Sequence, residues 1–130
     1  MQPGQPKGNG KYAHGKTGLR RILHTVIHSR DGFVATFKGE AAFRQLLLLH
    51  GALATVALLL DVSRSERALM LMVCFISLLV ELLNSAIEAV VDRISLEHHP
   101  LSKNAKDMGS AAQSTALLMV GTVWAVVLLG

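Results

Sequence analysis

The sequence contains a single cysteine, Cys74, among 130 residues. One cysteine excludes an intrachain disulfide and a metal site built from a cysteine cluster, so we expect Cys74, which lies within an apolar stretch, to be a packing residue. The first residues contain no apolar run, which argues against a secretory signal peptide. Acidic residues are also scarce there: residues 1–44 hold only Asp31 and Glu40, against eight lysines and arginines.

The composition is that of a membrane protein. Hydrophobic residues make up 51% of the chain and the mean hydropathy is +0.41, which is high for a soluble domain. The sequence pI is about 9.6. Because the basic residues flank apolar stretches, membrane topology and anionic lipid headgroups explain this charge better than a nucleic-acid partner does.

Residues 1–18 are rich in glycine, proline and lysine, and we expect them to form a disordered tail. Residues 10–17 match the letters of the phosphate-binding P-loop. That loop works only between a buried strand and a helix, which fix its backbone N–H groups around the phosphates. Residues 1–9 are unsuited to such a strand, so we interpret the match as a false positive.

Residues 19–37 are predicted to form an amphipathic helix at the membrane interface. Apolar residues recur there with helical spacing, and arginine and histidine occupy the opposite face. We expect Gly32 to interrupt this helix.

Three apolar stretches follow, at about 41–60, 68–91 and 108–129. Twenty helical residues reach about 30 Å, enough to cross the hydrocarbon of a bilayer. The polar segment 61–67 predicts a tight turn, and 92–107 a loop in which Pro100 breaks the helix and Ser102 caps the next one. The expected fold is therefore an all-α membrane protein, with three transmembrane helices plus an N-terminal amphipathic interfacial helix forming one domain over residues 19–130.

The orientation follows from the lysines and arginines. Eight lie in residues 1–44, which end just inside the first span, and three in residues 92–107, against two in residues 61–67. The positive-inside rule predicts that the N-terminus and the 92–107 segment are cytoplasmic.

Carboxylates occur within the second span. On a helix Glu81, Glu88 and Asp92 fall within about 40° of one another, and burying carboxylates in hydrocarbon is costly enough to indicate a functional site rather than a helix contact. Glu40 and the Lys106–Asp107 pair are expected at the same membrane surface. Carboxylates for magnesium, a lysine for phosphate and a spare base suit phosphoryl transfer. A proton-coupled transporter subunit would also place carboxylates in a span.

Three segments carry a family resemblance: EAAFRQ at 40–45, ELLNSAIEAVVDRI at 81–94 and AKDMGSAA at 105–112. They closely resemble the bacterial integral-membrane diacylglycerol kinases, and the resemblance extends from about Leu19 to the C-terminus. It implies a homotrimer that transfers the γ-phosphate of ATP to diacylglycerol, giving phosphatidic acid at the cytoplasmic membrane interface.

The resemblance also implies roles for individual residues. Glu81 would accept the substrate proton with help from Asn84, and Glu40 and Glu88 would hold Mg²⁺. Ser110 would lie with Glu81 near the lipid substrate. The residues implied in ATP binding are Arg21, His28, Glu40, Glu88, Glu97, His98, His99, Lys106 and Asp107.

This sequence departs from the family pattern at His28 and His98, where we expect aromatic residues. The related undecaprenol kinases share the central block, whereas residues 43–45 and 107–110 favour diacylglycerol as the substrate. Of the other polar residues, we expect His50 to make an intramembrane hydrogen bond and Gly109 to permit close helix approach.

Overall fold

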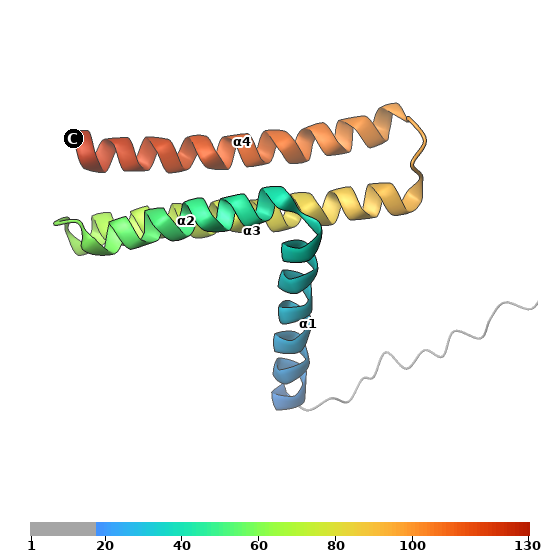
Figure 1. Ribbon diagram of the computed structural model, residues 1–130, viewed down its shortest axis with the longest axis horizontal. Helices are drawn as coiled ribbons and strands as arrows, with labels where there is room; N and C mark the ends of the chain where they lie inside the picture. Colours follow the sequence, from blue (N-terminus) through green and yellow to red (C-terminus); the bar gives the residue numbers. More distant parts are fainter. Residues whose placement is uncertain (1–17) are drawn as a thin grey trace, which may run out of the picture. The chain divides into compact units, whose positions relative to one another are not determined.

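The computed structural model describes residues 18–130, so the predicted tail and the P-loop-like pattern at 10–17 lie outside the described residues, apart from Gly18. It contains four helices and, within that range, no strand: α1 (Gly18–Gly39), α2 (Ala41–Leu59), α3 (Arg64–Ile94) and α4 (Pro100–Leu129). Figure 1 shows their order along the chain. The predicted all-α class is confirmed.

The first helix is continuous, so the predicted interruption at Gly32 is wrong. An interior glycine costs a helix only about 1 kcal/mol, and the residues on both sides of it are helical. No residue of α1 is buried, and its apolar face is exposed. The contacts divide the chain into one unit ending at Ala35 and a second covering Thr36–Gly130, so most of α1 is described by itself.

Glu40 is the single non-helical residue between α1 and α2. The last carbonyls of a helix lack hydrogen-bond partners within it, and here Arg44 is the donor to two of them. Its Nη1 donates to the carbonyl oxygens of Phe37 at 2.7 Å and Lys38 at 3.3 Å. The backbone around Glu40 is thereby fixed at the start of the first span.

The turn between α2 and α3 is closed by side chains. Ser63 and Glu66 form a capping box: Ser63 Oγ accepts from the Glu66 N–H at 3.2 Å, and Glu66 Oε2 accepts from the Ser63 N–H at 2.8 Å. Arg67 donates to the carbonyl oxygens of Ala57 at 3.0 Å and Leu60 at 2.8 Å. These bonds satisfy both helix ends and hold α2 antiparallel to α3.

Helices α2, α3 and α4 are each long and apolar enough to cross a membrane. Both α2 and α4 pack on α3, which is therefore the central helix (Figure 1). Buried positions recur every seven residues, at Phe43, His50 and Ala57 of α2. On α3 the buried positions with the same spacing are Met70, Ser77, Asn84 and Val91. Because of this spacing, the same face of each helix stays in contact with the neighbouring helix along its length.

The apolar core lies toward the turn between α2 and α3. Cys74 is 4% exposed within it, which confirms its packing role. Trp124 of α4 donates its indole N–H to the Met70 carbonyl oxygen of α3 at 3.3 Å. The opposite end of the helices, which carries the α3–α4 connection, is the polar one.

That connection is shorter than predicted. Helix α3 continues to Ile94 and α4 begins at Pro100, so only residues 95–99 are non-helical. Pro100 begins a helix because its fixed φ and missing N–H suit the first helical position. The cap is His99 rather than Ser102, with His99 Nδ1 accepting from the Leu101 N–H at 3.1 Å. The charged residues on either side of the connection therefore lie on rigid helical turns.

Candidate functional site

Glu81 is the buried carboxylate of the second span. Its residue is 6% exposed on α3, and the charges of Glu88 and Glu40 both act on it. The structure thus brings together the three glutamates that the sequence singled out, two from α3 and one from the start of α2. Like charges that act on one another in an apolar span are unfavourable by themselves, so a nearby cation would stabilise this arrangement.

Asn84 lies one turn beyond Glu81 and packs against Gly109 of α4. A Cβ placed on residue 109 would lie 2.1 Å from the Asn84 Oδ1 atom. Glycine is therefore required for the amide to occupy this space, and the predicted close helix approach is confirmed. The Asn84 oxygen is buried and has no hydrogen-bond partner within residues 18–130.

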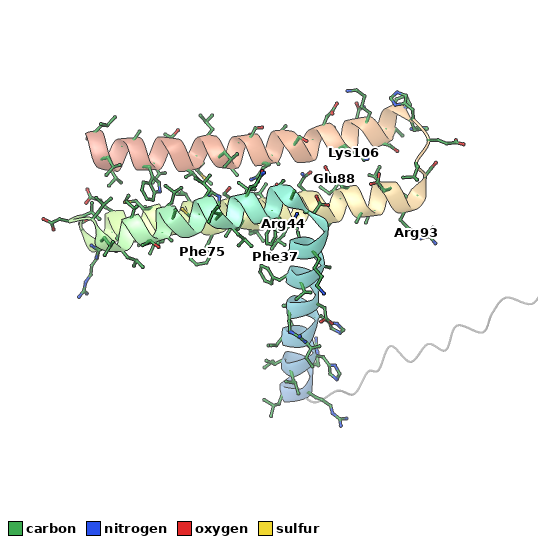
Figure 2. The ribbon with its side chains drawn as sticks, in the orientation of Figure 1. Phe37, Arg44, Phe75, Glu88, Arg93 and Lys106 are labelled. Atoms are coloured by element: carbon green, nitrogen blue, oxygen red, sulfur yellow. The ribbon has the colours of Figure 1, made fainter. Side chains whose placement is uncertain are left out.

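Lys106 of α4 forms an ion pair with Asp92 of α3, with 2.7 Å between Lys106 Nζ and Asp92 Oδ1. Both side chains are about half exposed, and Glu88 also interacts with the lysine. Figure 2 shows Glu88 and Lys106 on the facing sides of α3 and α4, whereas Arg93 points away from α4. The ammonium group of Lys106 therefore lies between the carboxylates of α3 and the α3–α4 connection.

Asp107 is exposed and pairs with Lys103, one turn before it on α4. Such an exposed pair contributes little to stability. Its two charges can therefore exchange partners at little cost when a ligand binds.

A cleft of about 290 Å³ lies at the α3–α4 connection. Five of the residues predicted to bind ATP line it: Glu97, His98, His99, Lys106 and Asp107. The sequence interpretation missed other lining residues. The sequence placed Asp92 on the carboxylate face but assigned it no role. Lys103 lies four residues before Asp107, and this spacing is the sequence signal for their ion pair. Ser95 and Ser102 also line the cleft.

Three predicted site residues are described separately. Arg21 and His28 are exposed on α1, in the unit that is described by itself. The His28 ring stacks on His24, with centroids 6.3 Å apart. Ser110 follows Gly109 on α4 but is itself exposed.

Within residues 18–130 no three His, Cys, Asp or Glu side chains are grouped to hold a metal ion. Magnesium does not require such a group, because it is commonly held by one or two carboxylates together with phosphate oxygens and water. The carboxylates of Glu40 and Glu88, whose charges both act on Glu81, offer the hard oxygen atoms that this mode of binding uses.

Comparison with known proteins identifies the family of this chain. Residues 27–128 match the family model described as prokaryotic diacylglycerol kinase. The chain belongs to this family.

Its curated relatives carry the same name. The chain is 66% identical over 116 residues to a diacylglycerol kinase of Pseudomonas aeruginosa, which covers 89% of this chain and 94% of the relative. It is 42% identical over 116 residues to that of Escherichia coli K12, covering 89% and 95% of the two chains. It is 39% identical over 107 residues to that of Helicobacter pylori strain 26695, covering 82% and 84%. The family recognised from the sequence is thereby confirmed, and the chain is a bacterial membrane protein.

The contact between Asn84 and Gly109 predicts an asymmetric response to alanine. Gly109→Ala forces the Asn84 amide out of place, and such overpacking costs about 1–3 kcal/mol. Gly121→Ala, on the same helix with open space around it, is expected to be neutral or to stabilise by about 1 kcal/mol. Thermal unfolding of both variants in detergent micelles measures the difference. Equal melting temperatures for the two variants would show that the close approach is absent.

Proposed function

We propose that this protein is a diacylglycerol kinase that transfers the γ-phosphate of ATP to the free hydroxyl of diacylglycerol, giving phosphatidic acid. The observation that carries the proposal is the buried Glu81 carboxylate, with Glu40 and Glu88 beside it, in a chain that belongs to the prokaryotic diacylglycerol kinase family. A lipid hydroxyl reaches this depth of a membrane without leaving the bilayer, which suits a base placed inside a span.

Glu81 is the proposed proton acceptor. The hydroxyl oxygen of the lipid forms a bond to the γ-phosphorus while the bond from that phosphorus to the β–γ bridging oxygen breaks. The hydroxyl proton passes to the Glu81 carboxylate, and ADP leaves with the bridging oxygen. Asn84, one turn away with its amide oxygen unpaired, is placed to orient the hydroxyl or the Glu81 side chain.

The nucleotide is proposed to occupy the cleft at the α3–α4 connection. Lys106 would exchange its partner Asp92 for a phosphate oxygen, and the N-terminal end of α4 favours negative charge. Glu97, His98 and His99 would flank the rest of the nucleotide, with Asp107 beside them. Arg21 and His28 of α1 are proposed to reach it from the membrane surface.

Glu40 and Glu88 are the proposed magnesium ligands. Bound Mg²⁺ would neutralise charge on the phosphates during transfer. The two glutamates come from different helices, so the arrangement of α2 against α3 determines how far apart their carboxylates lie. The lysines and arginines near the site are proposed to lie on the cytoplasmic side of the inner membrane. The N-terminus and the cleft would then both be on the cytoplasmic face.

The active unit is proposed to be a homotrimer. The spans leave large apolar side chains uncovered, such as Phe75, which is 71% exposed and points away from α4 (Figure 2). One protomer therefore provides little protein to shield its carboxylates from lipid. Crosslinking in native membranes is expected to capture trimers. Fully active membranes that yield only monomers would contradict this part of the proposal.

The substrate is tested by one assay with matched lipids. Membranes containing the protein are given ATP with diacylglycerol or undecaprenol, each with magnesium or with a chelator. We expect phosphate transfer to diacylglycerol that depends on magnesium. Transfer to undecaprenol alone would reassign the substrate. Solute movement driven by a pH gradient, without lipid phosphorylation, would replace the kinase with a transporter.

The roles of Glu81 and Glu88 are separated by glutamine substitutions. Glu81→Gln keeps the shape of the side chain and removes the proton acceptor, so turnover should fall roughly 10²–10⁴-fold while nucleotide still binds. Glu88→Gln should instead raise the magnesium concentration needed for nucleotide binding, with partial recovery in excess metal. Steady-state kinetics and nucleotide-binding titrations at several magnesium concentrations measure both effects.

Asp61→Asn is the matched control, because this exposed carboxylate lies in the turn between α2 and α3, at the far end of the spans. It should leave turnover and magnesium dependence unchanged. Near-normal turnover of Glu81→Gln, or equal loss of nucleotide binding in both glutamine variants, would mean that the two roles are assigned wrongly.

A further inference from the structure

A second polar cluster lies deeper in the spans, on the side of Glu81 away from the cleft. It contains one side chain from each span: His50 of α2, Ser77 of α3 and Gln113 of α4, which are 2%, 0% and 9% exposed. Ser77 Oγ lies 2.8 Å from His50 Nε2 and accepts from Gln113 Nε2 at 3.4 Å. The Ser77 hydroxyl therefore joins all three transmembrane helices.

This cluster is costly to bury. His50 Nδ1 and Gln113 Oε1 are both inaccessible and have no hydrogen-bond partner within residues 18–130. Apolar residues of similar size would avoid that cost. Polar residues buried at such positions are best understood as selecting one arrangement of helices over others, as a single buried asparagine does in a coiled coil.

The cluster lies one helical turn from the candidate site on α3 and α4, and farther from it on α2. Ser77 lies one helical turn before Glu81, and Gln113 lies one turn after Gly109, against which Asn84 packs. His50 lies ten residues after Glu40, about 15 Å along α2. Because Arg67 holds α2 only at the distant turn, the bond from His50 to Ser77 is the tie nearer to Glu40.

We infer that His50, Ser77 and Gln113 are positioning residues, whose hydrogen bonds hold α2 and α4 against α3 in the rotation that brings Glu40 to Glu81 and Glu88. They touch neither substrate. Their effect is on the Glu40–Glu88 pair, so the kinetic part of the test rests on the proposed function, whereas the structural part does not.

The chain offers matched variants for this test. In His50→Gln the amide nitrogen takes the place of Nε2 and keeps the bond to Ser77. In His50→Asn the shorter amide reaches only the place of Nδ1, and in His50→Leu the polar atoms are gone. Ser77→Ala removes the shared hydroxyl.

Thr55→Val on α2 and Thr115→Val on α4 are the controls, because each of these exposed hydroxyls bonds only to a carbonyl of its own helix, Gly51 and Ala111 respectively, among the bonds of the described residues.

Kinetics should separate positioning from a general loss of folding. We expect His50→Leu, His50→Asn and Ser77→Ala to raise the KM for Mg-ATP about tenfold or more, with kcat and the KM for diacylglycerol within about threefold of the starting protein. His50→Gln and both threonine variants should match the starting protein. A His50→Gln variant as impaired as His50→Leu, or a loss confined to kcat, would overturn the inference.

A distance measurement tests the same idea without activity. Spin labels are placed at the exposed positions Gln45 and Val90 after Cys74→Ser, and labelled protein is diluted with unlabelled protein so that pairs within one chain dominate. We expect His50→Leu to lengthen or broaden the distance distribution and His50→Gln to preserve it. An unchanged distribution in His50→Leu overturns the inference. If the starting protein phosphorylates no lipid, the proposed function fails while this measurement still decides the positioning role.

Discussion

The buried Glu81 carboxylate, placed within an apolar span, limits how the other two spans can pack. A carboxylate in hydrocarbon requires protein or water around it, and the chain provides protein by packing both α2 and α4 on α3. Glu40 then approaches from the start of α2, and Gly109 allows α4 close enough for Asn84 to be covered. The central position of α3 is the geometric consequence.

The polar contacts of α3 follow one another along its length. Beginning at the apolar core, the carbonyl of Met70 accepts from Trp124, Ser77 joins two neighbouring helices, and Asn84 packs on Gly109. The last contact is the ion pair of Asp92 and Lys106, which is half exposed. Because apolar side chains gain little from one another in a lipid environment, hydrogen bonds and close packing contribute much of the specificity between membrane helices.

Rigid helical turns on both sides of the α3–α4 connection give the cleft a fixed shape. Pro100 starts α4 directly, and the His99 ring caps it. The charges of Lys106 and Asp107 are thereby set on the first turns of a helix, while both remain in ion pairs that a ligand can replace. Under the proposed function, this charged cleft would hold the water-soluble phosphate donor, and the buried Glu81 carboxylate farther along α3 would face the lipid acceptor.

The sequence by itself determined the helical class, the three apolar spans and the family, because hydropathy over twenty residues and the block at 81–94 are local signals. It also identified Glu40, Glu81 and Glu88, since carboxylates beside or within apolar stretches are conspicuous. It misjudged Gly32 and the cap of α4, where weak local preferences compete. Only the tertiary structure decided that Lys106 pairs with Asp92, that Asn84 occupies the space at Gly109, and that His50, Ser77 and Gln113 meet. Those contacts join residues from different helices. The rotation and depth of each helix are set by packing against its neighbours, which no single stretch of sequence encodes.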